Sequence, residues 1–501
     1  MVSGFDRRRS YRSAVGRQLR TLASVGVAIA VSACAVGPDF HPPAAPTTTR
    51  YTSEQDPAVS ATPQIVLGAK ISRQWWTFFR SSMLDGVIRQ ALAHSPTLVA
   101  SNATLAKAQE QVTVASGQLE PQIDFGASAG RQKPGAAFVG PLARHFPPFT
   151  AYSIGATAHY DLDLFGGTRR LIEQQTALAS YQRFRLDAAY LSLTGSVVTE
   201  SVQIAALRLR IAIVQSIIVD DQKNVDLVQA AYTVGAATVV DVSSVESQLA
   251  NDQTLLPPLR QRLSESRDAL AILAGATPGD WQAPSFDLDT ITLPDAMPVV
   301  MPSELVHQRP DILAVEAQLH AASAAIGVAT ADMFPKIELS ASGATEELTT
   351  GALFGPGSAA WSLISAISQP IFHGGELAAK RRAAVDDFHA ALAEYEQTVL
   401  QSLGQVADSL HALAHDAEEL AAQKRAVKAA DLSLDLTRSA FQAGQVGAID
   451  VLDAERRAQQ ARLGYARARA QQYDDATQLF LATGGGVVGG DWTQGHGGPS
   501  G

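Results

Sequence analysis

The sequence predicts a mixed α/β membrane protein built from long α-helices and four short β-strands. Three observations indicate this class. The chain repeats itself in order, four segments alternate apolar and polar residues, and two long segments have helical periodicity without proline. With 501 residues, 46% of them hydrophobic and 18% charged, the chain is long enough to bury a large core. A mostly disordered chain is therefore excluded.

An internal two-fold repeat organises the chain. Residues 94–123 align without a gap on residues 308–337, and the phrase GAATVVDVSSVE at Gly235 returns as GQVGAIDVLDAE at Gly444. A stretch rich in proline and aspartate joins the copies. We therefore expect a signal peptide (1–33), an N-terminal linker (34–80), a first repeat (81–277), an inter-repeat segment (278–302), a second repeat (303–483) and a glycine-rich tail (484–501).

The first 33 residues have the pattern of a signal peptide, with an arginine-rich start and an apolar run too short to span a membrane. The run ends in VSAC, which resembles a bacterial lipoprotein signal. That resemblance implies cleavage before Cys34 and lipid on its sulfur and nitrogen, and Ala35 resembles outer-membrane sorting. Because Cys34 is the only cysteine, disulfides and all-cysteine metal sites are excluded. A formal charge of −10 makes nucleic acid an unexpected partner.

Alternation of apolar and polar residues, less regular in the fourth segment WSLISAIS, predicts four strands, two in each repeat. They lie near 121–131, 152–163, 335–345 and 361–371, each with one apolar face and one face of small polar residues. Strands of this length suit a membrane barrel, but small barrels need about eight strands. Because open edges in lipid leave backbone groups unpaired, the simplest arrangement is a barrel shared between subunits. The alternative is four strands of a soluble sandwich.

Long helices are expected from Gly167 to about Val234 and from Gly375 to about Ala443. Each would be roughly 100 Å long, which indicates coiled coil. A second helical segment follows each one and packs back antiparallel, over 238–275 and 447–482. The turns contain the helix-ending glycines Gly235 and Gly444. Pro257 and Pro258 should kink or break the returning helix of the first copy.

Two aspartates in the second turn, Asp450 and Asp453, share one helix face, whereas the first copy has Ser244 in place of the second. Such a pair suits acid/base catalysis, but no catalytic motif or metal-ligand spacing accompanies it. We therefore expect no enzyme and no metal site. In a monomer, a solvated helix face would be the simplest interpretation. In an assembly whose helices converge, the aspartates would form stacked acidic rings that favour cations.

Six segments together resemble the TolC-like outer-membrane factors, in particular the lipoprotein branch called OprM or NodT. They are WWTFFRSSMLDGVIRQALAHSPTL, DLDLFGG, QRPDILAVEAQL, FPKIELSASG, PIFHGGELAAKRRAA and GAIDVLDAERR. The resemblance implies a homotrimer with a twelve-stranded outer-membrane barrel, four strands per chain, continued by a tunnel of antiparallel helices. It also implies a small equatorial domain, expected here around 75–80, the inter-repeat segment and the C-terminal region. No cofactor is implied beyond the lipid on Cys34.

The same resemblance assigns roles to the two turns. Asp450 and Asp453 would constrict the tunnel at the periplasmic end. Where family members often have tyrosine and arginine before the turn, this chain has Phe441 and Gln442, so we expect a closed aperture held mainly by helix packing. Adaptor docking is expected at three turn residues, Gly235, Asp241 and Gly444.

The expected function is an exit duct in the outer membrane, anchored by lipid and extending into the periplasm. Its partners would be a periplasmic adaptor and a proton-driven inner-membrane pump, which together expel drugs, metals or other toxic small molecules. Two alternatives stay open. One is a duct for type I protein secretion, and the other is a coiled-coil envelope lipoprotein without a channel, which would need no lipid-facing strands.

Overall fold

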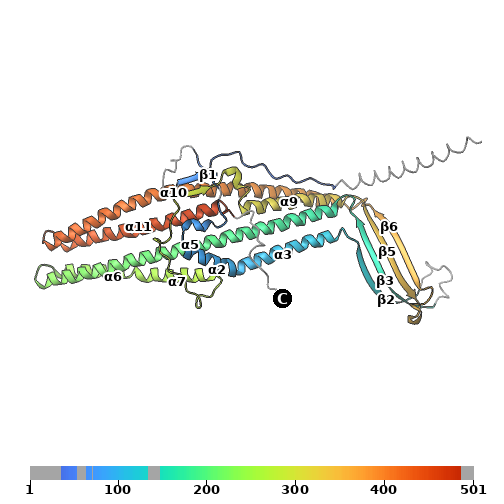
Figure 1. Ribbon diagram of the computed structural model, residues 1–501, viewed down its shortest axis with the longest axis horizontal. Coiled ribbons are helices and arrows are strands. Elements are labelled where there is room, and N and C mark those ends of the chain that lie inside the picture. Colours follow the sequence, from blue (N-terminus) through green and yellow to red (C-terminus); the bar gives the residue numbers. More distant parts are fainter. Residues whose placement is uncertain (1–34, 54–63, 70, 134–146, 487–501) are drawn as a thin grey trace, which may run out of the picture. The chain divides into compact units, whose positions relative to one another are not determined.

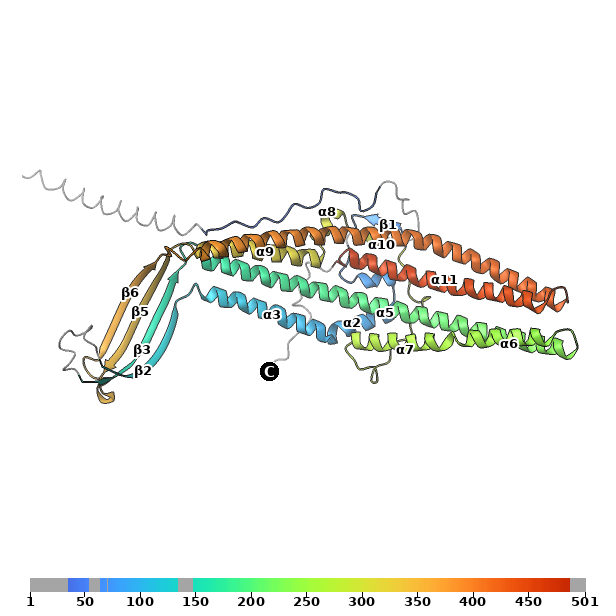
Figure 2. The ribbon, with the colours of Figure 1, turned by 180° about the vertical axis from the view of Figure 1, so that it is seen from behind.

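The computed structural model describes residues 35–53, 64–69, 71–133 and 147–486 (Figures 1 and 2). The expected signal peptide, Cys34 and most of the expected tail lie outside these residues. The chain divides into two units. Unit 1 comprises 1–42, 105–181 and 316–394, and unit 2 comprises 43–104, 182–315 and 395–501.

Unit 1 contains one four-stranded antiparallel sheet. Its strands are β2 (Gln122–Gln132), β3 (Phe149–Leu162), β5 (Lys336–Glu347) and β6 (Ala359–Ser368), in the spatial order β2-β3-β5-β6 (Figure 1). The strands start and end within a few residues of the predicted segments. The pairing of β3 with β5 joins the first repeat to the second. Within the described chain, β2 and β6 each have a neighbour on one side only.

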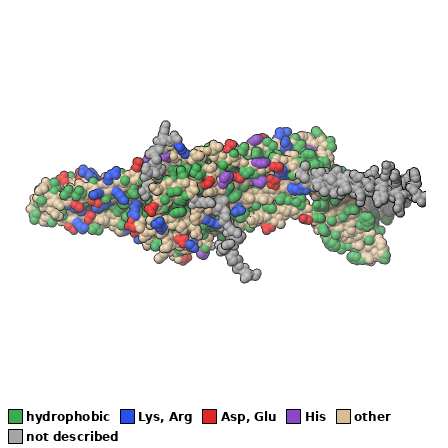
Figure 3. All heavy atoms as spheres, turned by 45° about the horizontal axis from the view of Figure 1, so that its top comes forward, with side chains coloured by type: hydrophobic (Ala, Val, Ile, Leu, Met, Phe, Trp, Pro, Cys, Tyr) green, Lys and Arg blue, Asp and Glu red, His purple; other side chains and the backbone are tan. Residues whose placement is uncertain are grey.

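The register gives the sheet two different faces. Because directly paired residues point to the same side, one face carries the row Phe125, Ala156, Gly343 and Trp361. The adjacent row, on the other face, is Asp124, Thr157, Ser342 and Ser362. The predicted alternation is thus observed in β2, β3 and β5 and is less regular in β6, where Ile364 lies on the face of Ser362. Large apolar side chains on the first face are open to the surroundings, with Trp361 82% and Leu363 75% exposed. Figure 3 shows hydrophobic side chains gathered over the strands.

Two long helical hairpins form most of unit 2, one from each repeat. The first consists of α5 (Gly167–Thr233), α6 (Val239–Gln253) and α7 (Leu256–Leu273), and the second of α10 (Glu376–Gln442) and α11 (Ala448–Ala482) (Figures 1 and 2). The prolines act as expected, because α6 ends before them and α7 begins with proline in its first turn. The second repeat lacks them and keeps one uninterrupted helix, α11.

Shorter helices precede the strands in both repeats. In the first repeat they are α2 (Ser82–His94) and α3 (Pro96–Gly117), and in the second they are α8 (Pro302–Leu305) and α9 (Pro310–Ala331). The residues around α3 and α9 are the ones that align without a gap in the sequence. The repeat therefore extends to the order of elements, which is two helices, two strands and a long hairpin in each half.

A small mixed region of unit 2 brings together the three segments expected in the equatorial part. Strand β1 (Gln64–Leu67) pairs in parallel with β4 (Ala296–Val299) from the inter-repeat segment. The 3₁₀-helix η1 (Trp75–Phe79) contributes Trp75, which is fully buried and stacks on Phe480 of α11 with ring centroids 5.3 Å apart. Aromatic side chains bury large apolar areas, so this cluster fixes the N-terminal segment against the C-terminal helix.

Candidate functional site

The two hairpin turns have the same backbone geometry. Gly235 and Gly444 adopt φ angles of +78° and +72°, in the left-handed region that favours glycine. The amide that follows each glycine donates to the carbonyl five residues earlier, at 2.8 Å in the first turn and 2.9 Å in the second. This is the Schellman ending of a helix. The turns are therefore built in the same way, and their differences lie in the side chains.

The first aspartate of each turn caps the helix that follows. Asp241 accepts hydrogen bonds from the amide of Thr238 at 2.8 Å and from its hydroxyl at 2.7 Å, which hold the pKa of the Asp241 carboxyl below its usual range. Asp450 accepts a bond from the amide of Gly447 at 2.9 Å. Both carboxylates satisfy an amide at a helix start. Asp450 is thus a structural residue in each subunit, whatever it adds in an assembly.

The second aspartate is the one that differs between the copies. Asp453 lies one turn further along α11 and forms an ion pair with Arg456 at 2.9 Å, both side chains being about half exposed. In the first copy the equivalent positions are Ser244 and Ser247, and the Ser244 hydroxyl donates to a carbonyl of its own helix. The second copy therefore carries an adjacent positive and negative charge where the first carries two hydroxyl groups.

An apolar cluster lies just behind the turns and joins the two hairpins. We call it the tip cluster; its buried members are Val228, Val242, Val245 and Ala448. Phe441 packs against it, together with Leu452. The residue that replaces the expected tyrosine is therefore part of the packing between the hairpins. Gln442 is exposed.

Behind the tip cluster, a buried carboxylate links three helices. Glu455 of α11 is 3% exposed and accepts hydrogen bonds from the side chains of Asn224 on α5 and Arg438 on α10, the latter at 2.8 Å. A buried charge needs such partners because its desolvation is costly. The Asn224 bond crosses from the first hairpin to the second.

In unit 1, a buried arginine holds the first described residues of the chain. The side chain of Arg170, at the start of α5, binds Asp39 at 2.7 Å and Glu173 at 2.7 Å, and it donates to the carbonyl of Val36 at 3.2 Å. The guanidinium lowers the pKa of Asp39. Burial would raise the pKa of Glu173, but its bonds from Arg170 and His320 lower it overall. We call this group of residues the N-terminal clamp.

Two glycines make room for the clamp. A Cβ on Gly327 of α9 would lie 2.7 Å from Cγ of Arg170, and a Cβ on Gly37 would lie 2.5 Å from the backbone of Gly327. Gly37 also has a φ angle of +102°, which glycine adopts without strain. The segment that starts at Ala35 therefore lies directly against the helices next to the sheet.

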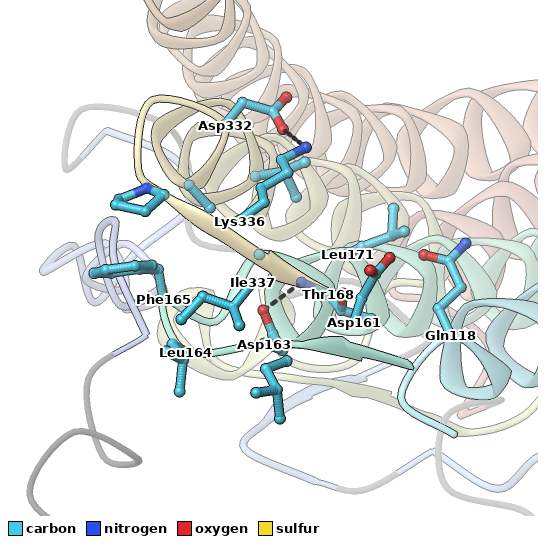
Figure 4. Close-up of a pocket in the computed structure, with 15 residues that line it drawn as sticks. Gln118, Asp161, Asp163, Leu164, Phe165, Thr168, Leu171, Asp332, Lys336 and Ile337 are labelled. Carbon is cyan, nitrogen blue, oxygen red and sulfur yellow. Dashed lines mark hydrogen bonds and ion pairs between the residues drawn. The ribbon is translucent and has the colours of Figure 1, made fainter. Parts of the chain in front are cut away.

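The junction between strands and helices encloses a cavity of about 260 Å³ (Figure 4). Asp163 points into it and accepts a bond from the amide of Thr168 at 3.1 Å, which caps the start of α5. Asp332 and Lys336 form an ion pair at 2.9 Å on the opposite side. These three polar groups have partners in the chain and belong to the packing of the junction.

A second cavity of about 600 Å³ lies in unit 2, beside Arg309 of the QRPDI motif. Arg309 is buried, donates to the carbonyl of Ala482 at 2.7 Å, and binds Asp311 and Gln405. It therefore ties the start of α9 to α10 and to the end of α11. Among the described residues, no group of three or more His, Cys, Asp or Glu side chains is arranged to hold a metal ion.

The family described as "Outer membrane efflux protein" matches residues 87–276 and 301–485, which is most of the chain and follows the two repeats. The chain belongs to the outer membrane efflux protein family. The predicted family and outer-membrane location are confirmed, and the protein is a channel protein and not an enzyme. Its assignment to the lipoprotein branch stays a prediction.

Individual relatives agree with this assignment over nearly the whole chain. The pyoverdine export outer membrane protein OpmQ of Pseudomonas aeruginosa is 30% identical over 422 residues, covering 83% of this chain and 87% of that protein. The cation efflux system protein CusC of Escherichia coli K12 is 27% identical over 469 residues, covering 92% and 98%. The solved structure of the outer-membrane channel OprN matches with a TM-score of 0.84 and 27% identity, over 91% of this chain and all of that one.

Sequence reasoning found the turns but missed the buried polar residues around them. Asp450, Asp453, Gly235, Asp241 and Gly444 all lie in or next to the two turns. Arg170, Arg309 and Glu455 were not singled out, because each depends on partners more than 100 residues away in the chain. For two of them the signal was a place inside the quoted motifs, since Arg309 belongs to QRPDI and Glu455 to GAIDVLDAERR; Arg170 lies three residues after DLDLFGG.

The capping role of Asp450 can be separated from any role of its charge. Asp450→Ala removes the acceptor for Gly447 and should cost about 1 kcal/mol, so amides 448–452 should exchange hydrogen about five times faster. Asp450→Asn keeps an acceptor oxygen and should stay near the wild type. Asp241→Ala and Asp241→Asn are the matched pair in the first turn. Equal fraying in Asp450→Asn and Asp450→Ala would mean that the charge, and not the hydrogen bond, stabilises the helix start.

The N-terminal clamp should fail when Gly327 gains a side chain. Gly327→Ala forces the Arg170 side chain to move, at a cost of about 1–3 kcal/mol, and should release residues 35–42 to limited proteolysis. Gly404→Ala is the control, because a Cβ on this helical glycine meets open space and should be neutral or stabilising by up to about 1 kcal/mol. Unchanged cleavage in Gly327→Ala would show that the segment is held elsewhere.

Proposed function

We propose that three copies of this chain form a lipid-anchored exit duct that passes small molecules from a periplasmic adaptor and an inner-membrane pump to the exterior. The observation that carries the proposal is the open four-stranded sheet, with one exposed apolar face and one polar face. An efflux role in the outer membrane already follows from the family. The assembly, the anchor, the gate and the substrate class are the proposed parts.

The sheet argues for a barrel completed by other subunits. Exposed apolar rows such as the one containing Trp361 need lipid or another apolar surface, while the row containing Ser362 needs water. Lipid also requires that the backbone groups at the outer edges of β2 and β6 be paired. Pairing β6 of one copy with β2 of the next satisfies them, and three copies give twelve strands. The helices that follow then continue the ring as a tunnel.

The lipid anchor is supported by the position of the residues that follow Cys34. Val36 donates its amide to the carbonyl of Phe165 at 2.9 Å, directly between the end of β3 and the start of α5. An acylated Cys34, two residues earlier, would then lie close to the end of the strands, where lipid headgroups meet a membrane barrel. The clamp around Arg170 would keep it there.

The gate is proposed at the turn of the second hairpin. In a trimer, the Asp450 and Asp453 side chains of three subunits would surround one axis, and like charges that converge repel. Arg456 lies beside Asp453 in each subunit, so the outer ring would alternate in sign and the inner one, at Asp450, would be purely acidic. Phe441 in the tip cluster supports closure by packing. The turn residues Gly235, Asp241 and Gly444 remain the proposed surface for the adaptor.

Small molecules are the proposed cargo because named relatives handle them: OpmQ is described as exporting pyoverdine and CusC as part of a cation efflux system. A type I secretion duct uses the same architecture and is the second candidate, although no feature of this chain favours it. A passive coiled-coil rod is disfavoured by the apolar sheet face. The proton-driven pump stays part of the proposal.

A charge placed on the apolar sheet face should block membrane insertion. Leu363→Arg should destabilise the folded protein by about 2–4 kcal/mol if residue 363 lies near the bilayer midplane, and should lower the amount of heat-resistant trimer in outer-membrane fractions. Ser362→Arg is the control on the opposite face, where only one hydroxyl contact with Ser342 at 2.8 Å is lost, a cost of about 1 kcal/mol. A barrel whose lipid face is elsewhere would tolerate both changes equally.

Single-channel recording tests the duct and the gate together. Purified wild-type protein in planar bilayers should conduct and prefer cations. Asp450→Asn combined with Asp453→Asn keeps a capping oxygen at residue 450 while removing both charges, so it should lose most of the cation preference and of the block by divalent ions. Current in neither protein would favour the rod. If the double variant conducts with the selectivity of the wild type, the proposed duct stands and the proposed gate at Asp450 and Asp453 is wrong.

A further inference from the structure

A layer of polar side chains interrupts the apolar packing between the two hairpins. On the side of the turns it borders the tip cluster, and on the other side it borders an apolar cluster built on Leu207, Val214 and Leu259. Between these clusters, α5 contributes Asp221, α6 contributes Asp252 and α11 contributes Glu455, each more than 90% buried. Three buried acids in one layer are costly unless something neutralises them.

Amide side chains satisfy part of this polar layer. Gln248 donates to Oδ2 of Asp252 at 2.8 Å, and Gln459 of α11 donates to the same oxygen at 3.0 Å and to Oδ1 of Asp221 at 3.5 Å. The Gln459 bonds cross from one hairpin to the other. With the Asn224 bond to Glu455, they make this layer the main polar contact between the hairpins among the described residues behind the turns.

One position in the layer lacks a donor. Asp221 is 3% exposed, and its Oδ2 has no hydrogen-bond partner within the described part of the chain. The side-chain amide of Gln459 reaches both Asp221 and Asp252, so the two carboxyl groups lie next to each other, but two ionised carboxylates cannot donate to each other. A proton on one of them supplies the missing donor.

The surroundings of Asp221 favour that proton. Burial, the neighbouring carboxyl group of Asp252 and the negative charges of Glu455 and Asp220 raise the pKa of Asp221 to about 8. Two positive groups lie near the layer among the described residues: Arg438 of α10 is 4.0 Å from Asp220 and 2.8 Å from Glu455, and the exposed Lys223 is 3.2 Å from Asp220. Because Arg438 is engaged there, it does not neutralise the Asp221–Asp252 pair. Among the described residues, no group of three or more His, Cys, Asp or Glu side chains here is arranged to hold a metal ion.

We infer that Asp221 and Asp252 share a proton that latches the first hairpin to the second, and that loss of this proton loosens the hairpins behind the turns. This inference rests on the proposed function in one respect, since loosening here would ease opening of the proposed gate. The latch itself is a property of the single chain. Gln459 and Glu455 are the side chains of the second hairpin that face the Asp221–Asp252 pair.

The direction of the pH effect follows from the raised pKa. A carboxyl group that binds its proton more tightly in the latched state favours that state at low pH and disfavours it as the pH rises through its latched-state pKa. The latch is therefore complete below the ordinary carboxyl range and is lost progressively up to about pH 8. Over that window, release of one proton changes the ratio of loosened to latched chains by up to about tenfold per pH unit.

The distance between the hairpins tests the latch directly. Spin labels are attached to Val239→Cys and Ile449→Cys, both at exposed positions, and the distance between them measures the separation of the two hairpins. Labelled chains are mixed with an excess of unlabelled chains so that the measured distances lie within one chain. The wild-type background should give a short, narrow distance distribution at pH 5.5 and a longer, broader one at pH 9. Asp221→Asn, which cannot ionise, should keep the short distribution at both values. Chains without added cysteines control for labelling at Cys34.

Two further variants make the outcome decisive. Asp226→Asn alters an exposed acid on the same helix and should retain the wild-type pH response. Asp252→Asn should remove the pH response, and it provides a second test in case Asp221→Asn does not fold. A pH response that persists in both Asp221→Asn and Asp252→Asn, or no response in the wild type, would overturn the latch. Conductance recorded in parallel separates the proposals: a distance change without any current leaves the latch standing and rejects the duct.

Other buried acids do not confuse this measurement. Asp416 and Asp474 also have pKa values raised by burial and neighbouring carboxylates, to about 7 and about 6. On α11, Asp474 lies about 20 residues beyond Glu455, which is roughly 30 Å along a helix. The distance between labels at the turns therefore depends mainly on the layer around Asp221. Comparing the Asp221 variants with the wild type gives the contribution of this layer.

Discussion

A β-sheet in lipid cannot leave the backbone groups of its edge strands unpaired, and the rest of this structure depends on that constraint. The described sheet has four strands, two edges, one apolar face and one polar face. It is too small to close on itself. In the proposed assembly, closure through other copies pairs both edges, and it places lipid on the row of Trp361 and water on the row of Ser362. Each strand continues into a helix, so a closed ring of strands implies a closed ring of helices.

Comparing the two copies separates the turn residues that helix geometry requires from those found in one copy only. Both hairpins end in a glycine with positive φ and restart with a capping aspartate, because these positions are fixed by helix geometry. The need for a hydrogen-bond acceptor at the start of the second helix explains Asp241 and Asp450 equally well. It does not explain why the second copy has Asp453 and Arg456 where the first has two serines. The asymmetry that matters is therefore an added pair of opposite charges and not an added acid by itself.

The parts of the fold that depend on local periodicity could be predicted from the sequence. Alternation of period two located the four strands within a few residues, and the prolines at 257 and 258 located the break between α6 and α7. What could not be predicted are contacts between positions far apart in the chain. Asp450 looked like half of a charged pair because the sequence does not show that its carboxylate is occupied by the amide of Gly447. Asp221 and Asp252 lie on different helices and only the fold brings them together.

The polar layer behind the turns also bears on how a duct can be both stable and openable. The apolar clusters on either side of it hold the hairpins together at any pH, since aliphatic side chains do not titrate. If they alone joined the hairpins, opening would require breaking packed contacts with no chemical trigger. A buried carboxyl pair lowers the stability of the closed arrangement and makes what remains depend on one proton. If the proposed gate and latch act together, a closed state weakened in this way would need less work from an adaptor bound at the turns, and that work would decrease as the pH of the surrounding compartment rises.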